Sequence, residues 1–164
     1  VIRYEHTSRG IGDVYKRQLQ GTTLSDASGG WYHVVFTFDD SSNRIRLYVN
    51  GSQVASKTHN NSTVNQNSAF SIGRRHDSNA AYYAGKIDEV AYWNTELSAN
   101  AISTLYNSGT PLSASSNSGN YTSSGNLVAY YQFQENLNDS EGSFTLTNYN
   151  NNIGSSNYVA ETIE

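Results

Sequence analysis

The segment from Trp31 to Gly51 constrains the fold of this chain more than any other part of it. Residues 31–39 and 45–49 are two runs that each fit a β-strand, in which successive side chains point to opposite faces. Asn50-Gly51 follows at once, and a type I′ turn needs positive φ at both central positions, which Asn and Gly tolerate. We therefore predict a two-residue hairpin in which residues 53–57 return antiparallel to residues 45–49.

One helix is expected further along, near residues 98–107. Ser98 is suited to the N-cap position, and the apolar residues that follow share one face of a helix. Gly109 suits the position after the helix, and Pro111 prevents its continuation. Ala101 stands where a Glu would complete a capping box, so the predicted cap rests on Ser98 alone.

The composition favours a polar all-β protein with many loops. Hydrophobic residues make up 36% and charged residues 15% of the chain, against about 45–50% and about 25% in typical domains. The net charge of −4 and the lack of clustered Lys and Arg exclude a typical nucleic-acid-binding protein. The chain has no Cys, which excludes disulfides and thiolate chemistry, and no apolar run of membrane-spanning length.

Five blocks of sequence resemble, in order and spacing, the laminin-G-like domains with a concanavalin A-like fold. Ala101 departs from that pattern, which usually has Glu there. The resemblance covers about residues 19–109 and implies an all-β, antiparallel, two-sheet jelly-roll sandwich, truncated, with one short helix near residues 98–107. The matching residues are Trp31, His33, Val34, Thr37, Phe38, Asp39, Leu47 to Gly51, Ile72, Gly73, Gly85, Ile87 to Val90, Trp93, Leu97, Ser98, Ile102, Leu105 and Tyr106.

Residues 1–18 are expected to be foreign to the domain. The hexapeptide at residues 13–18 can be back-translated into a sequence that resembles the mosaic end used in transposase-based library preparation. We interpret residues 1–18 as a non-native sequencing-adapter artefact in a metagenomic gene. The alternative is a genuine basic N-terminal strand. Residues 19–109 then form the C-terminal two-thirds of a laminin-G-like domain.

Residues 110–125 are a Ser/Gly/Asn-rich linker by composition. Residues 126–164 resemble the opening of a laminin-G-like domain, so they are either the start of a second domain in a tandem array or the closing strands of the first. The two interpretations are compatible, and we predict that Leu127 to Phe133 pair with residues 31–93 in one compact sandwich. Its single core would include Phe36, Phe38, Ile45, Leu47 and Val90.

No constellation of residues typical of an enzyme is present, and we expect a non-catalytic protein. His33 lies in a predicted strand, where a structural role is favoured over catalysis. Asp88 and Glu89 are adjacent, so on a strand they would face opposite sides and could not act as a glycosidase pair. A structural hydrogen bond from one of them to loop amides is the simpler interpretation.

Two ligand sites are predicted at the loops. Sugar sites use exposed aromatic rings with a few polar groups, which makes Arg74, Arg75, His76, Tyr82 and Tyr83 the candidate binding residues. Calcium prefers carboxylate and carbonyl oxygens, and the candidate ligands are Asp88, Asp139 and the carbonyls near Gly142. Core packing is the simpler role for the remaining aromatic residues Trp31, Phe36, Phe38, Phe70 and Trp93.

The resemblance implies a binding or adhesion module of a large secreted or cell-surface bacterial protein. A glycan or cell-surface polysaccharide is the expected partner, together with neighbouring repeats of the same chain. Two alternatives stay open at this stage. The first is a structural spacer repeat without a ligand, and the second is an accessory domain of a secreted glycoside hydrolase or protease.

Overall fold

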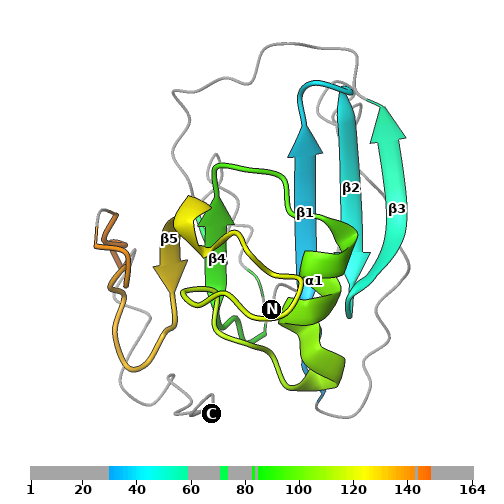
Figure 1. Cartoon of the computed structure of the whole chain (residues 1–164). Coiled ribbons are helices and arrows are strands. Elements are labelled where there is room, and N and C mark those ends of the chain that lie inside the picture. Colours follow the sequence, from blue (N-terminus) through cyan, green and yellow to red (C-terminus); the bar gives the residue numbers. More distant parts are fainter. Residues whose placement is uncertain (1–29, 59–70, 74–82, 84, 143, 149–164) are drawn as a thin grey trace.

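The computed structural model describes residues 30–58, 71–73, 83, 85–142 and 144–148. Within them, β1, β2 and β3 form an antiparallel three-stranded sheet in that order, and β4 pairs with β5 in a second, two-stranded sheet (Figure 1). The expected all-β architecture with one short helix is confirmed. The elements are β1 (Val34–Asp39), β2 (Arg44–Val49), β3 (Ser52–Thr58), β4 (Val90–Trp93), α1 (Ala99–Tyr106), two 3-10 turns (Asn107–Gly109 and Ser124–Asn126) and β5 (Leu127–Tyr131).

The hairpin between β2 and β3 is confirmed. Val49 pairs with Ser52, and the two residues between them both have positive φ, 48° at Asn50 and 75° at Gly51. The register shifts between Leu47 and Tyr48, which leaves Val54 without a partner as a β-bulge. The tip of the hairpin lies against α1, because a Cβ added at Gly51 would stand 3.0 Å from the Tyr106 ring.

The helix α1 occupies the predicted position. The Ser98 hydroxyl accepts a hydrogen bond from the Ala101 amide at 3.1 Å, which is the expected N-cap. The helix ends at Asn107, whose φ of 43° is left-handed and whose N–H bonds to the Ser103 carbonyl, so Asn107 rather than Gly109 provides the C-cap. Ala101 is buried, and the residue that departs from the family pattern therefore contributes to the core.

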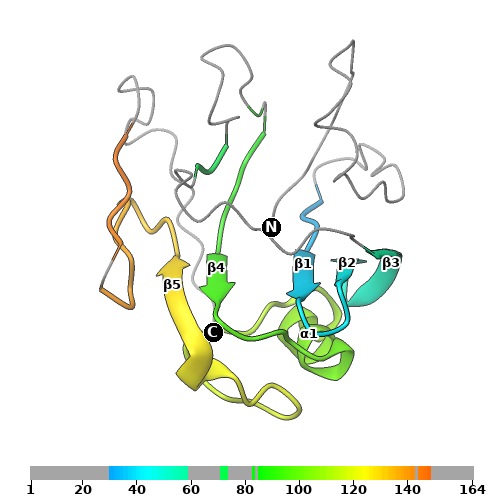
Figure 2. The same cartoon turned by 90° about the horizontal axis from the view of Figure 1, so that it is seen from above.

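A first core, here called the helix core, lies between α1 and the sheets. Its buried members come from β2, from α1 with the residues before it, and from the connection to β5: Tyr48, Leu97, Ala101, Ile102, Leu105 and Tyr121. Val35 of β1 and Trp93 of β4 pack against the same cluster. The helix core thus joins the three-stranded sheet to the two-stranded sheet, and Figures 1 and 2 show α1 beside β1.

A second core forms around the β4–β5 pair, so the prediction of a single core is wrong. It consists of Val90, Ala129 and Tyr131, with half-buried Ile72, Ile87, Phe133 and Leu146 packed against it. Phe36 is 59% exposed and Trp31 is 39% exposed, which contradicts their predicted burial. The reason at β1 is alternation, because Val35 and buried Thr37 face the α1 side and Phe36 faces away from it.

The predicted pairing of Leu127 to Phe133 with the earlier strands is confirmed for residues 127–131, and the strand ends before Phe133. β5 lies antiparallel to β4, with Val90 opposite Tyr131 and Tyr92 opposite Ala129. The connection that reaches β5 is not the free linker that its composition indicated. Tyr121 and Ala114 are buried in it, and Ser118 and Tyr121 form an isolated antiparallel bridge. Residues 110–125 therefore form a packed loop.

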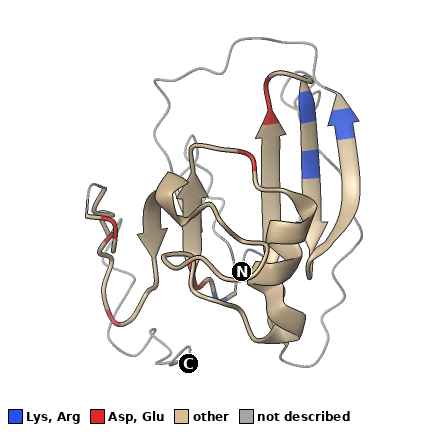
Figure 3. Cartoon of the chain, in the orientation of Figure 1, with Lys and Arg blue, Asp and Glu red and all other residues tan. Residues whose placement is uncertain are grey.

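The charged side chains of the described residues are unevenly distributed. The basic residues of the strands, Arg44, Arg46 and Lys57, lie on β2 and β3, and the acidic residues Glu135, Asp139 and Glu141 follow β5 (Figure 3).

In the part of the chain that the structure describes, no helix has the length and apolar character needed to cross a bilayer. Residues 1–18, with the predicted adapter sequence, lie outside the described residues.

Candidate functional site

Most of the predicted sugar-binding residues fall outside the described part of the chain. This applies to Arg74, Arg75, His76 and Tyr82, as it does to Phe70 among the predicted core residues. Tyr83 is described and half-buried, and its amide donates to the Gly73 carbonyl at 2.8 Å. Its ring lies against the backbone of Gly85, where an added Cβ would come within 2.6 Å of the phenol oxygen. The grouping of these five residues stays a prediction.

Asp139, one of the predicted calcium ligands, accepts hydrogen bonds from backbone amides of β5 and of the residues that follow Asp139. It is 7% exposed. Oδ1 accepts from the amides of Tyr130 at 2.8 Å and Glu141 at 3.0 Å, and Oδ2 accepts from the Phe144 amide at 3.0 Å. A carboxylate that accepts several backbone N–H groups holds the loop around it in one conformation.

The same turn covers the outer edge of β5. Ser140 donates to the Tyr130 carbonyl from its amide at 2.8 Å and from its hydroxyl at 3.1 Å. With Asp139 bonded to the Tyr130 amide, both backbone groups of Tyr130 that point away from β4 have partners. Exposed strand edges template unwanted pairing with other chains, and this turn removes part of that edge.

Glu89, next to the other predicted calcium ligand, has an unusual environment. Asp88 Oδ1 accepts from the Glu89 amide at 3.1 Å, and Glu89 has a left-handed φ of 52°. The pair precedes β4, which begins at Val90, so the prediction that Asp88 and Glu89 face opposite sides of a strand does not apply. The Tyr130 hydroxyl donates to Glu89 Oε2, and Glu89 Oε1 is buried without a hydrogen-bond partner.

Burial raises the pKa of the Glu89 carboxyl and that of the Tyr130 hydroxyl to which it is bonded. Among the described residues, no group of three or more His, Cys, Asp or Glu residues is placed to hold a metal ion. Calcium at Asp88 and Asp139 stays a prediction.

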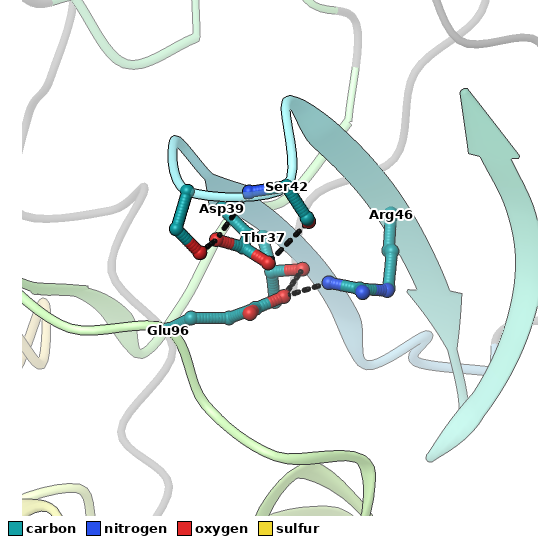
Figure 4. Close-up of polar contacts among 6 residues, drawn as sticks. Thr37, Asp39, Ser42, Arg46 and Glu96 are labelled. Carbon is teal, nitrogen blue, oxygen red and sulfur yellow. Dashed lines mark hydrogen bonds and ion pairs between the residues drawn. The ribbon is translucent and has the colours of Figure 1, made fainter. Parts of the chain in front are cut away.

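A polar cluster that the sequence did not indicate joins the start of α1 to the first sheet. Glu96 Oε1 accepts from the Thr37 hydroxyl at 3.0 Å and forms an ion pair with the Arg46 guanidinium (Figure 4). Thr37 and Arg46 are cross-strand partners on β1 and β2, so one carboxylate fastens the connection between β4 and α1 to both strands. Because Thr37 is buried, its hydroxyl needs this acceptor.

The β1–β2 turn is closed by Asp39, which lies near the same cluster in Figure 4. Its carboxylate accepts from the Ser41 hydroxyl at 2.6 Å, from the Ser42 amide at 3.2 Å and from the Ser42 hydroxyl. These hydrogen bonds lower the pKa of Asp39 to about 2. The carboxylates of Asp39, Glu96 and Asp139 therefore all make contacts that shape the fold.

His33 has the structural role that its position predicted. Its amide donates to Asn50 Oδ1 at 3.0 Å, and its carbonyl accepts from the Asn50 amide at 2.8 Å. The ring stacks on Tyr106 of α1 with a centroid distance of 5.9 Å. Burial lowers the pKa of His33 to about 4, so the imidazole is neutral at physiological pH.

Four large hydrophobic side chains of the described residues are exposed: Trp31 (39%), Phe36 (59%), Tyr92 (58%) and Phe144 (55%). Isolated exposed aromatic rings occur on ordinary surfaces, but a ring fixed on a strand is also the common platform for a sugar. Tyr92 stands on β4, two residues before Asn94.

The order of strands, turn and helix agrees with a comparison against protein families. The family described as the concanavalin A-like lectin/glucanases superfamily, Laminin_G_3, matches residues 6–103. The chain belongs to this family. The matched range of this laminin-G-like chain includes residues 6–18, and the assignment of residues 1–18 to an adapter stays a prediction.

Two further comparisons add little to the family assignment. A search of solved structures found the S-layer domain-containing protein (residues 221–444) of Clostridium thermocellum, with 26% sequence identity and a TM-score of 0.43. The match covers 52% of the laminin-G-like chain and 42% of the other, so it spans less than half of that protein's length. A comparison with curated protein sequences found no significant match.

Proposed function

We propose that this laminin-G-like chain is a non-catalytic module that binds carbohydrate and belongs to a secreted or cell-surface bacterial protein. Membership of the concanavalin A-like lectin/glucanases superfamily carries the proposal. The composition supports it, because a chain with a net charge of −4 that is rich in Tyr, Asn and Ser offers hydrogen-bonding groups and aromatic rings.

The non-catalytic part of the proposal is supported by two of the described carboxylates, those of Glu96 and Asp139. Glycoside hydrolysis needs one carboxyl group that protonates the leaving oxygen and a second that acts from across the scissile bond. Glu96 is bonded to Thr37 and Arg46, and Asp139 accepts three backbone amides. Groups held in this way stabilise the fold and are poorly placed to exchange protons with a substrate.

A glycan array probed with the full chain tests the proposal. We expect binding to a restricted set of neutral glycans and no release of reducing sugar from the glycans that bind. A parallel array with EDTA in place of calcium tests the predicted metal, because loss of binding on chelation would support a calcium site and unchanged binding would contradict it. The absence of binding to any glycan in either buffer would contradict the proposed function and favour a structural spacer.

A further inference from the structure

Tyr92 lies near the end of the β4–β5 ladder, and Asn94 and Asn126 are bonded to each other just beyond it. The Asn94 amide donates to the Asn126 carbonyl at 3.0 Å, and the Asn126 side-chain Nδ2 donates to Asn94 Oδ1 at 3.1 Å. A further bond from the Asn126 amide to the Ser123 carbonyl, at 3.0 Å, holds the turn that precedes β5. These contacts fix the two side-chain amides relative to each other.

We infer from the alternation of β4, continued to Asn94 by the backbone bond to Asn126, that the side chains of Tyr92 and Asn94 share one face. Trp93 between them packs against the helix core and donates from Nε1 to the buried Tyr121 hydroxyl at 2.9 Å. Side chains alternate along a strand, so the residues on either side of Trp93 project from the opposite face. The register shift at this point places its extra residue, Val128, on β5 and leaves the alternation on β4 intact.

The side-chain bond between the two asparagines leaves the Asn94 Nδ2 donor and the Asn126 Oδ1 acceptor unused. It uses Asn94 Oδ1 and one hydrogen of Asn126 Nδ2, and both residues are exposed to solvent. Asn94 Nδ2 and Asn126 Oδ1 make no hydrogen bond within the part of the chain that the structure describes. Two neighbouring hydroxyls of a sugar ring supply the complementary acceptor and donor, because each hydroxyl has both functions.

We propose that Tyr92, Asn94 and Asn126 form a subsite for a neutral sugar residue. The exposed Tyr92 ring takes the apolar C–H face of the sugar, and the paired amides bind two adjacent hydroxyls. No charged side chain takes part, which favours a neutral sugar over an acidic one. The inference rests on the proposed function, since it locates the sugar on a module already proposed to bind carbohydrate.

The test uses the full chain with the glycans that bind it on the array, measured by isothermal titration calorimetry. We expect Tyr92→Ala and Asn94→Ala each to weaken binding by about tenfold or more, whereas Tyr92→Phe keeps the ring and stays within about threefold. Phe144→Ala is the matched control, because it removes another exposed aromatic ring and should leave binding unchanged. A thermal melt of each variant checks that the fold persists.

The outcomes separate the subsite from the function. If the wild-type chain binds a glycan and both Tyr92→Ala and Asn94→Ala bind it equally well, the subsite is wrong and the proposed function stands. If Phe144→Ala weakens binding as much as Tyr92→Ala does, the effect is not specific to the subsite, and the inference is also overturned. If the wild-type chain binds no glycan, the function and the subsite both fail.

Discussion

The strands of the two sheets are connected in different ways. β1, β2 and β3 follow one another in sequence and are joined by short turns with left-handed residues, Asn43 in one and Asn50-Gly51 in the other. β4 and β5 are separated by the residues from 94 to 126, which include α1 and the packed loop after it. Their pairing therefore depends on contacts that are distant in sequence.

The side chains that hold the β4–β5 pair and the loops around it together are polar and buried. Asp139 bonds three backbone amides beside β5, and the Tyr121 hydroxyl accepts from Trp93 Nε1 and donates to the Ala114 carbonyl at 2.6 Å. Removal of one partner leaves the others buried without hydrogen bonds, which costs more than an average bond contributes. We expect single substitutions to damage the β4–β5 side more than the hairpin.

The largest effect is expected for Asp139→Ala. It removes the acceptor for the amides of Tyr130, Glu141 and Phe144, and we expect the free energy of unfolding to fall by about 3–4 kcal/mol. Urea denaturation measures this loss. Glu141→Ala is the control, because it removes an exposed carboxylate of the same turn and should change stability by less than about 0.5 kcal/mol. Equal losses in the two variants would show that the turn does not depend on Asp139.

Tyr121→Phe should have the next largest effect. The ring stays in the helix core, but the Trp93 indole N–H and the Ala114 carbonyl lose their partner, which should cost about 2–3 kcal/mol. The measurement is the thermal unfolding midpoint by circular dichroism. Tyr92→Phe removes an exposed hydroxyl and serves as the control. A neutral Tyr121→Phe would mean that water replaces the lost hydroxyl.

The stability of the three-stranded side should depend on pH through His33. The folded-state pKa of about 4 lies below the ordinary value of 6.5, so between these values the unfolded chain binds the proton and the folded chain does not. Stability is then fully present above pH 6.5 and falls as the pH drops toward 4, by about 2 kcal/mol between pH 7 and pH 5. Urea titrations at the two pH values measure the difference, and His33→Phe should remove it. A His33→Phe variant with the same pH dependence would assign the effect to other groups.

The smallest effect is expected at the hairpin turn. Gly51→Ala places a Cβ at a φ of 75° and 3.0 Å from the Tyr106 ring, and we expect a loss of about 1–2 kcal/mol in the free energy of unfolding. Gly125→Ala is the matched control, since an added Cβ there meets nothing within 4 Å. Unchanged stability of Gly51→Ala, relative to Gly125→Ala, would show that the turn conformation is not essential.

The local features of the fold were predictable because their signals are local. The Asn50-Gly51 turn requires left-handed backbone, and Ser98 before an apolar helical face marks an N-terminus; both predictions are confirmed. The family pattern added the antiparallel sandwich, which local signals do not give. The pairing of β5 with β4 followed from the need of an open sheet for a further strand.

The polar contacts of the β4–β5 side were not predictable in the same way. Composition marked residues 110–125 as a linker, but Tyr121 within them is fully buried, and one aromatic residue outweighs its polar neighbours. Asp139 carries the same sequence signal whether its oxygens accept amides or bind calcium. Both partners of Glu96, Thr37 and Arg46, are distant from it in sequence. The predicted burial of Phe36 was wrong because which face of β1 is buried depends on where α1 packs.

Native-state hydrogen exchange of the amides of Tyr48 and Tyr131 tests most directly that the helix core makes the two sheets one cooperative unit. Tyr48 lies in β2 and Tyr131, the partner of Val90, lies in β5, and the helix core contacts β1, β2 and β4. The Tyr131 amide is chosen because that of Tyr130 donates to Asp139 and would lose its acceptor in Asp139→Ala. We predict that the Tyr48 and Tyr131 amides exchange with the same opening free energy, and that Asp139→Ala lowers both by the same amount. Exchange of Tyr131 at a much lower opening free energy, with Tyr48 unchanged by Asp139→Ala, would show that the two sheets unfold independently.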